Sequence, residues 1–408
     1  MCYVDQAVAM SATSRVAAAT EPHPTVVLLV DDQAIVGESI RFMLAELPNL
    51  EFHHCMDPAK AIPMANAIRP TVILLDLVMP EIDGLLLVKY FRANKATRET
   101  PMIVLSSKEE AVIKAKAFGL GANDYLVKLP DKLELVARVK YHSRAYLTLL
   151  ERNEAYRTLA ATQHQMAEEL ATAARYVQSL LPKPLAGAVV ASWKFVPSSQ
   201  LAGDMFGYHW LDPEKLVVYL LDVSGHGVGS ALLAVSAGNV ISNRSLPDTD
   251  FADPGGVLKR LNDVFQMEKQ NEKYFTIWYG VFDVPTRKLR FSNAGHPAPL
   301  LFNGPCCDTA ELKSLESSSF AVGMVPEWEF DTEEVILQPF ARLLLFSDGV
   351  FEIDKPGGGM WHYPEFVEFI KAQDDKPPSV MDRLYEHVKI IRGGDILNDD
   401  YSMVEVRF

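Results

Sequence analysis

The longest uninterrupted pattern of apolar and polar positions lies in the middle of the chain. Between Pro130 and Pro182 there are 51 residues without proline or glycine, the two residues that most often interrupt a helix. Apolar residues recur there every seven positions, and a 3.5-residue period keeps such a seam facing a partner helix. The two registers of the seam are Tyr156, Gln163, Leu170 and Val177, and Leu159, Met166, Ala173 and Leu180.

Seven of these eight seam positions are apolar, which predicts a long helix that pairs as a coiled coil. Gln163 in the seam would cost stability but could fix the register of a dimer. The alternative is an amphipathic helix that packs on its own protein. In either case the pattern predicts a signalling helix between an input domain and an output domain.

Before this helix, short apolar runs alternate with segments long enough to form helices. This alternation is typical of βαβ units and predicts a parallel, doubly wound α/β sheet. The four runs are Val26–Val30, Val72–Leu75, Met102–Leu105 and Tyr125–Val127.

A polar residue follows each of these runs. The ends of parallel strands meet at one edge of the sheet, so three carboxylates, a hydroxyl and an ammonium are expected to lie together there. Such acids repel one another unless a hard cation such as Mg²⁺ binds them, and one of them could accept a phosphoryl group. A single aspartate after a strand would more simply cap a helix, but the whole set indicates a site. The set is Asp31, Asp32, Asp76, Ser106 and Lys128.

Residues 25–145 closely resemble a bacterial response-regulator receiver domain, a flavodoxin-like fold. The resemblance is carried by "VDD" (Val30–Asp32), "LLDLVMPEIDG" (Leu74–Gly84), "IVLSS" (Ile103–Ser107) and "GANDYLVK" (Gly121–Lys128). In this chain Leu129 separates the lysine from Pro130, whereas many receivers place the proline directly after it. The resemblance implies Asp76 as phosphoacceptor, Asp31, Asp32, Asp76 and the Val78 carbonyl as Mg²⁺ ligands, Ser106 and Tyr125 as a switch pair, and Lys128 as the phosphate-binding lysine.

After the helix the chain is rich in strands. Consecutive strands interrupted by two helical stretches predict an α+β layered sandwich. The predicted strands are Lys215–Leu221, Phe275–Val284, Lys288–Ser292, Leu300–Asn303 and Arg342–Phe346, and the predicted helices are Val228–Asn243 and Gly256–Gln270.

Aspartates again stand at the boundaries of these runs, and Asp204 and Asp348 lie directly beside glycine. Glycine lets the backbone approach a ligand closely. Four separated acids of this kind would suit two Mg²⁺ or Mn²⁺ ions about 3.5–4 Å apart, which can activate a water against a phosphoester. Each "DG" alone is typical of a turn. The acids are Asp204, Asp222, Asp348 and the pair Asp399 and Asp400.

Residues 186–408 resemble the metal-dependent (PPM) protein phosphatases of the SpoIIE/RsbU type, an αββα fold. The matching motifs are "AGD" (Ala202–Asp204), "DVSGHG" (Asp222–Gly227), "SNAGHPAPLL" (Ser292–Leu301), "FSDGVFE" (Phe346–Glu352) and "DDYS" (Asp399–Ser402). Ala202 and Gly207 depart from the usual pattern, and the second departure weakens any claim to an extra metal. The resemblance implies metal ligands at Asp204, Asp222, Asp348, Asp399 and the Val223 carbonyl, with Asp400 as the alternative to Asp399. His226 and His296 lie in these motifs and are expected to be structural.

Composition and charge disfavour several classes of function and location. The net charge of −14 disfavours nonspecific nucleic-acid binding, which depends on Lys and Arg. No apolar run reaches the roughly 18 residues that a membrane span requires. Residues 1–24 lack a basic segment and a compact apolar core, so we expect a flexible leader. The four cysteines, Cys2, Cys55, Cys306 and Cys307, show no metal-ligand spacing and fit a reducing cytoplasm.

The sequence therefore predicts a leader (1–24), a receiver domain (25–145), a coiled-coil linker (146–185) and a phosphatase domain (186–408). The resemblances imply a response regulator, the cysteines fit the cytoplasm, and the heptad pattern alone predicts a homodimer. A sensor histidine kinase or phosphotransfer protein would phosphorylate Asp76, which would control hydrolysis of phosphoserine or phosphothreonine on a STAS-type anti-sigma-factor antagonist. The alternative is a non-catalytic adaptor that binds a sigma factor for proteolysis, although degenerate adaptors normally lose the metal acids that this chain keeps.

Overall fold

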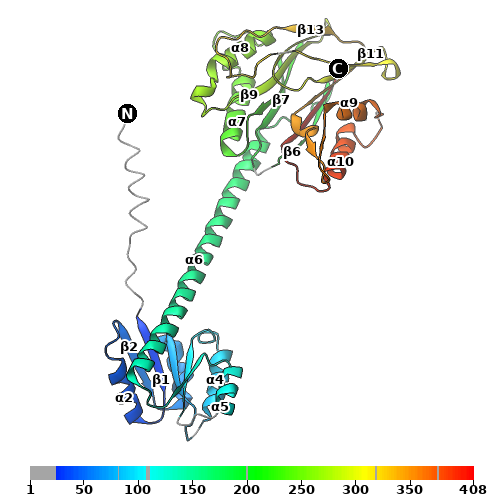
Figure 1. Cartoon of the computed structure of the whole chain (residues 1–408). Helices are drawn as coiled ribbons and strands as arrows, with labels where there is room; N and C mark the ends of the chain where they lie inside the picture. The colour runs from blue at the N-terminus through cyan, green and yellow to red at the C-terminus, as the bar shows by residue number, and fades with distance from the viewer. Residues whose placement is uncertain (1–23, 81, 107–110, 199–200, 318, 375) are drawn as a thin grey trace. The chain divides into compact units, whose positions relative to one another are not determined.

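The computed structural model describes residues 24–80, 82–106, 111–198, 201–317, 319–374 and 376–408 (Figure 1). The chain divides into two compact units, with the boundary between Gln163 and His164. The leader predicted over residues 1–24 lies outside the described residues except for Pro24.

The N-terminal unit contains one parallel sheet of five strands, in the order β2-β1-β3-β4-β5. The predicted doubly wound α/β fold is confirmed. The sequence pattern did not reveal β2, because three of the six residues of this edge strand are polar and the strand is only partly buried. The strands are β1 (Thr25–Val30), β2 (Leu50–Cys55), β3 (Val72–Asp76), β4 (Met102–Ser106) and β5 (Asp124–Val127).

Helices cover both faces of this sheet. Successive side chains of each strand point to opposite faces, so the strands contribute apolar side chains to a core on each side of the sheet. Leu28, Ile73 and Val104 face the α3–α5 side, whereas Leu29 and Leu74 face α2 and the start of α6. The helical elements are α2 (Ala34–Leu44), η1 (Pro58–Lys60), α3 (Ala61–Ile68), α4 (Gly84–Ala93) and α5 (Ala111–Gly119).

The predicted long helix is confirmed as α6, which runs without a break over Lys132–Ser179. Its first turns pack on the sheet through Leu135 and Val139, which are fully buried. The side chains of Tyr156 and Leu159 in the seam are more than half exposed. Pairing of two such helices stays a prediction.

The C-terminal unit contains two antiparallel five-stranded sheets and a short hairpin. The sheet orders are β13-β10-β9-β8-β7 and β12-β11-β14-β17-β6, and β15 pairs with β16. The strands of the first sheet are β7 (Asp204–Asp212), β8 (Lys215–Val223), β9 (Phe275–Asp283), β10 (Lys288–Ala294) and β13 (Glu333–Ile336). Those of the second are β6 (Val190–Val196), β11 (Leu300–Gly304), β12 (Glu311–Ser314), β14 (Phe340–Phe346) and β17 (Tyr401–Arg407), and the hairpin is β15 (Ile353–Asp354) with β16 (Met360–Trp361).

The two sheets pack face to face with a pair of helices on each outer side, which confirms the predicted αββα sandwich (Figure 1). Inward residues such as Leu220 and Leu345 share one apolar cluster, while Phe346 and Met403 face α9 and α10. The helical elements are α7 (Val228–Ser242), α8 (Pro254–Val264), η2 (Met267–Lys269), η3 (Cys307–Thr309), η4 (Asp348–Val350), α9 (Tyr363–Lys371) and α10 (Val380–Arg392).

Candidate functional sites: two acid-rich centres

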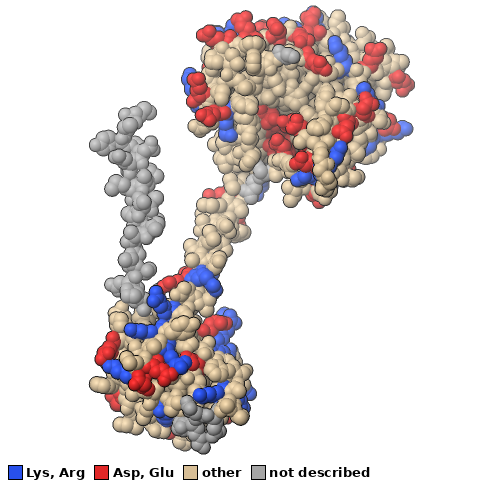
Figure 2. All heavy atoms as spheres, in the orientation of Figure 1, with Lys and Arg blue, Asp and Glu red and all other residues tan. Residues whose placement is uncertain are grey.

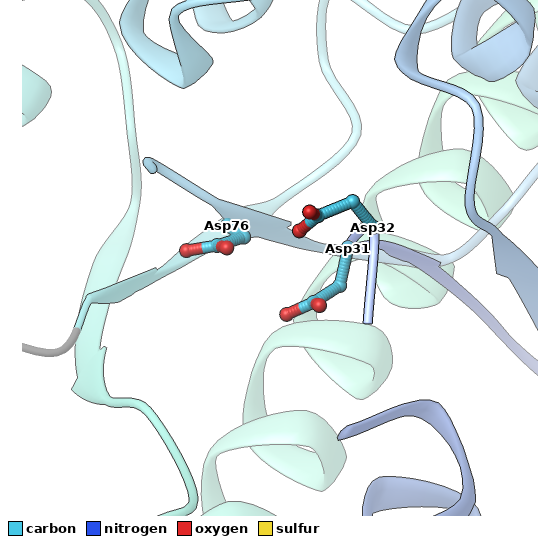
Figure 3. A group of neighbouring side chains, drawn as sticks. All are labelled: Asp31, Asp32 and Asp76. Carbon is cyan, nitrogen blue, oxygen red and sulfur yellow. The ribbon is translucent and has the colours of Figure 1, made fainter. Parts of the chain in front are cut away.

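The first acid cluster consists of Asp31, Asp32 and Asp76, at the carboxyl ends of β1 and β3. These strands are neighbours, with Val30 opposite Leu75, so the residues that follow are brought together. Oxygens of the three carboxylates lie within 4.8 Å of one another (Figure 3). Asp31 is fully buried and Asp76 is 1% exposed. The structure thus assembles the three acids that the sequence placed at strand ends.

Lys128 supplies a positive charge to this cluster. Its ammonium lies 2.8 Å from Asp76 and 3.0 Å from Asp31. Burial disfavours the charged lysine, but hydrogen bonds to Asp76 and Asp31 outweigh it, so the pKa of Lys128 is raised. Burial raises the pKa of Asp31 despite the neighbouring ammonium. The chain itself therefore neutralises part of the cluster.

The remaining residues predicted for this site lie at the same edge. Ser106 ends β4, is 1% exposed and accepts a hydrogen bond from the Lys128 amide through its carbonyl. Tyr125 lies in β5 and is 8% exposed, with the Lys114 ammonium 4.5 Å from its ring centre. Val78 follows β3, and its amide donates to Asp76 Oδ1.

Gly84 explains one feature of the "DG" motif in this region. A Cβ at Gly84 would lie 2.3 Å from the Asp76 carbonyl oxygen, so only glycine lets α4 begin against β3. Asp83 caps that helix by accepting from the Leu85 amide. The motif thus holds the loop after Asp76 in place.

The first acid cluster fits a divalent cation. Three carboxylates offer oxygen ligands from one edge, the kind of ligand that Mg²⁺ prefers. Among the described residues, Asp32 Oδ1 is buried without a hydrogen-bond partner. An oxygen of this kind is costly unless a cation or solvent satisfies it.

The second acid centre consists of Asp204, Asp222, Asp348, Asp399 and Asp400, contributed by both sheets of the C-terminal unit. Asp204 begins β7 and lies opposite Asp222 on β8. Asp348 follows β14, and the Asp399–Asp400 pair precedes β17, which pairs with β14 at Phe346 and Met403. Figure 2 shows Asp and Glu side chains gathered on the visible face of this unit. Acids up to 196 positions apart in the sequence therefore converge.

Burial and mutual repulsion govern the electrostatics of this centre. Burial, followed by repulsion from Asp348, Asp399 and Asp400, raises the pKa of Asp222 to about 8. Burial and Asp399 raise the pKa of Asp348 to about 6.

Asp204 shows the same effect. It is 2% exposed, and burial with repulsion from Asp222 and Asp400 holds its pKa well above the usual range. Its Oδ2 is buried without a hydrogen-bond partner in the described part of the chain. A bound cation would relieve both the repulsion and the unsatisfied oxygen, so these acids fit divalent metal ions.

The two neighbouring aspartates of "DDYS" differ in their surroundings. Asp400 is 4% exposed, and its carboxylate accepts from the Ser198 amide and hydroxyl and from the Gly203 amide. Asp399 is exposed and accepts at Oδ1 from the Asp400 amide. Asp400 therefore ties the segment before β7 to β17, whereas Asp399 keeps an oxygen available for a ligand.

Gly349 lets these segments approach one another. A Cβ there would lie 2.2 Å from the Asp400 carbonyl oxygen, so the turn after Asp348 requires glycine. His226 is exposed and lowers the pKa of Asp399, although desolvation of the part of that carboxyl that faces the centre leaves the pKa raised overall. His296 is fully packed in the interior, where burial lowers its pKa to about 3 and its Nδ1 pairs with the Thr276 hydroxyl at 2.9 Å.

The two centres differ in compactness. Among the described residues, the first cluster is the one group in which at least three acidic, histidine or cysteine ligand atoms lie within 4.8 Å of one another. Sequence reasoning also missed Ser198 and Lys273, which hold backbone segments of the second centre. Neither residue lies in a recognisable motif, so the sequence carried no signal for them.

Comparison with known proteins assigns both regions. Residues 27–140 match the response regulator receiver domain family. Residues 212–408 match the family described as Stage II sporulation protein E (SpoIIE), and Asp204 lies just before that range. The chain joins a receiver domain to a SpoIIE-type domain.

Relatives of the SpoIIE-type domain include two proteins of Bacillus subtilis. The phosphoserine phosphatase RsbP is 32% identical over 38% of this chain and 38% of its own length. The phosphoserine phosphatase RsbU is 24% identical over 62% of this chain and 73% of its own length. The chain thus spans well under half of RsbP.

A solved structure supports the fold of the SpoIIE-type domain. The SiaA-PP2C domain of Pseudomonas aeruginosa superposes with a TM-score of 0.51 at 19% identity, over 61% of this chain and 99% of that one. At that identity the likeness shows the fold alone. Of the helices that the structure describes, none combines the length and apolar character needed to cross a membrane.

Proposed function

We propose that this protein is a response regulator in which phosphorylation of Asp76 controls a metal-dependent serine/threonine protein phosphatase. The observation that carries the proposal is the convergence of Asp204, Asp222, Asp348 and Asp399 at one place in a SpoIIE-type domain. Both Bacillus relatives are named phosphoserine phosphatases, which supports the same reaction here.

In the receiver domain, Asp76 would accept a phosphoryl group from a sensor histidine kinase or a phosphotransfer protein. Asp31 and Asp32, with Asp76 and the Val78 carbonyl, would hold Mg²⁺, while Lys128 would bind the phosphoryl oxygens. Lys128 already lies 2.8 Å from the Asp76 carboxylate. Ser106, at the end of β4, and Tyr125, in the neighbouring β5, would respond to the new charge.

In the SpoIIE-type domain, Asp204, Asp222, Asp348, Asp399 and the Val223 carbonyl would hold two Mn²⁺ or Mg²⁺ ions. Bound ions of this kind lower the pKa of a water and neutralise phosphate charge. The aspartates hold the ions, Asp400 fixes the backbone around Gly203, and Gly349 lets the two strand ends approach. The buried histidine His296, with its lowered pKa, would stay neutral and structural.

The linker helix would connect the two activities in a dimer. The seam residues Tyr156, Leu159 and Met166 are more than half exposed, and a second copy of the same helix would cover them. We further propose a STAS-type anti-sigma-factor antagonist as the phosphoprotein substrate, because the resemblance to SpoIIE/RsbU-type phosphatases implies a sigma-factor pathway. We propose the cytoplasm as the location.

The proposal is tested by the rate of phosphate release from a serine-phosphorylated STAS protein in Mn²⁺. The rate is measured with and without beryllofluoride, which mimics phosphoaspartate, in the wild type and in Asp76→Ala. We expect beryllofluoride to raise the rate in the wild type and to have no effect in the variant. A metal-dependent rate that beryllofluoride lowers would reverse the sign of control, and no release in any state would favour the adaptor.

A further inference from the structure

Lys273 lies beside the second acid centre but belongs to none of its motifs. It stands just before β9 and is partly buried. Its ammonium donates to the Ser224 carbonyl at 3.2 Å and to the Ser230 hydroxyl at 3.0 Å. Ser224 belongs to the Asp222–Gly227 loop, which here includes the last two residues of β8, both proposed metal ligands, and the turn that follows them. The lysine side chain thus connects the start of β9 to that loop.

The path of the lysine side chain depends on two glycines. A Cβ on Gly229 would lie 3.2 Å from Lys273 Cε, and a Cβ on Gly225 would lie 3.5 Å from its Nζ. The side chain therefore runs directly over the loop and the first turn of α7. Gly225 and Gly227 adopt φ values of 77° and 90°, so the loop has little conformational restraint of its own.

The contacts hold Ser224 from every side. Its amide donates to the Tyr274 carbonyl at 2.9 Å, and its hydroxyl accepts from the Tyr274 amide at 3.1 Å. Its carbonyl accepts from Lys273 and also from the Ser230 hydroxyl at 3.2 Å. Residues 273 and 274 together fix both peptide groups that flank Ser224.

This fixation determines the direction of the Val223 carbonyl. The Val223 carbonyl and the Ser224 amide belong to one planar trans peptide, in which C=O and N–H point in opposite directions. Because the Ser224 amide points at Tyr274, the Val223 carbonyl points away from β9. The Val223 amide donates to the Gly203 carbonyl at 3.3 Å, next to Asp204.

We propose that Lys273 is a positioning residue of the phosphatase centre, whose ammonium clamps the Asp222–Gly227 loop and so holds the Val223 carbonyl and Asp222 in place for metal binding. The inference rests on the proposed function, because it takes Asp222 and Val223 as metal ligands. It adds a residue that no motif of the sequence singles out.

The clamp and simple electrostatics predict opposite results. An ammonium near a cation site repels the cation, so removal of its charge alone would tighten metal binding. Removal of a clamp would weaken binding, since loss of a partner that orients a ligand typically costs about 10–100-fold in metal affinity. The sign of the change therefore identifies the role.

The test is titration calorimetry of Mn²⁺ binding to the full-length protein, with phosphatase rates measured alongside. For Lys273→Met we expect the Mn²⁺ dissociation constant to rise about tenfold, while kcat at saturating Mn²⁺ stays near that of the wild type. Lys273→Arg keeps the charged donor and should restore most of the affinity. The matched control is Lys269→Met, an exposed lysine four residues earlier, which should bind Mn²⁺ like the wild type.

Unchanged or tighter Mn²⁺ binding by Lys273→Met would overturn the clamp. If that variant fails to unfold cooperatively, Ser230→Ala removes one of the two acceptors of the ammonium and keeps the lysine. It should weaken Mn²⁺ binding by about threefold, as expected from the loss of one hydrogen bond, and wild-type binding would again overturn the clamp. A wild type that binds Mn²⁺ but releases no phosphate contradicts the proposed function alone. An active wild type with an unaffected Lys273→Met contradicts the clamp alone.

Discussion

The receiver and the SpoIIE-type domain each gather buried aspartates, but they balance the charge in different ways. In the receiver, Lys128 lies within 3.0 Å of both Asp31 and Asp76. In the second centre, Asp204, Asp222, Asp348 and Asp399 form no ion pair with lysine or arginine among the described residues, and repulsion helps to raise the pKa of Asp222 to about 8.

The difference follows from topology and has a chemical consequence. Neighbouring parallel strands end at one edge, so a lysine after β5 can reach acids after β1 and β3. The second centre joins two antiparallel sheets, and in the described part of the chain no strand end brings a lysine into an ion pair with its carboxylates. The receiver can therefore assemble its acids without an ion, whereas the second centre depends on cations for charge balance.

The largest effect is expected for Asp222→Ala. This change removes the acid on which the repulsion in the second centre converges, and phosphatase activity should fall by about a thousandfold, the upper range for loss of a group that stabilises charge in the transition state. The same variant should still be phosphorylated at Asp76 by acetyl phosphate to the wild-type extent, as measured by gel mobility. Equal loss of both activities would mean that the two centres are not independent.

Lys128→Met tests the charge balance of the receiver. Removal of one partner of a buried ion pair typically costs about 3 kcal/mol, and Lys128 is only 13% exposed at its side chain. Chemical denaturation with a chelator should show this loss in the receiver transition.

Saturating Mg²⁺ should recover part of the lost stability, because the cation takes over the neutralising role of the ammonium. A loss of the same size with and without Mg²⁺ would contradict the idea that lysine and cation balance the same acids. Lys114→Met, which removes the ammonium over the Tyr125 ring, is the matched control and should be insensitive to Mg²⁺.

The adjacent acids are expected to have different roles: Asp399 as a metal ligand and Asp400 as a structural support. Asp399→Asn should weaken Mn²⁺ binding with little change in metal-free stability. Asp400→Asn weakens the hydrogen bonds from Ser198 and Gly203 and should lower stability by about 1–2 kcal/mol. Calorimetry and denaturation distinguish the two, and the reverse pattern would make Asp400 the ligand.

The smallest expected effect is a pH dependence of the metal-free SpoIIE-type domain. Asp222 and Asp348 have folded pKa values of about 8 and about 6, above the unfolded value of 3.8. The folded state therefore binds more protons, and the stability that these groups contribute is lost as pH rises through their folded pKa values. In chelator, the unfolding temperature should fall by a few degrees between pH 5.5 and 8.

Two controls accompany the pH series. Asp222→Asn should flatten the pH dependence, because the group with the highest pKa in the pair no longer titrates. Mn²⁺ should remove it, because bound cations keep the acids ionised. An unfolding temperature that rises over the same range in chelator would show that the acids are not coupled as described.

The sequence predicted the parts of the fold in which apolar patterning decides structure. The doubly wound sheet, the αββα sandwich and the continuous helix followed from the spacing of apolar residues and from motif resemblance. The strand β2 did not, because three of the six residues of "LEFHHC" are polar and this edge strand is stabilised by pairing with β1. Such a strand depends on its neighbour more than on its own composition.

For the sites, the sequence located the acids but not the groups that hold them. Asp204 was recognisable beside glycine and Asp222 at the end of an apolar run, yet their direct opposition on β7 and β8 depends on strand register. The support of Asp400 by Ser198 spans 202 positions, and the contact of Lys273 with Ser224 spans 49. Contacts of this kind arise from tertiary packing, which no local pattern encodes.

Because α6 is unbroken, its geometry limits the kind of movement that could pass along it as a signal. A straight α-helix drifts by about 20° per heptad relative to a strict seven-residue repeat. Two copies that pair along the seam from Tyr156 to Leu180 must therefore wind around each other in a left-handed sense. In such a dimer, tighter or looser winding would turn each helix about its own axis, so a signal would reach Ser179 as a rotation rather than as a displacement.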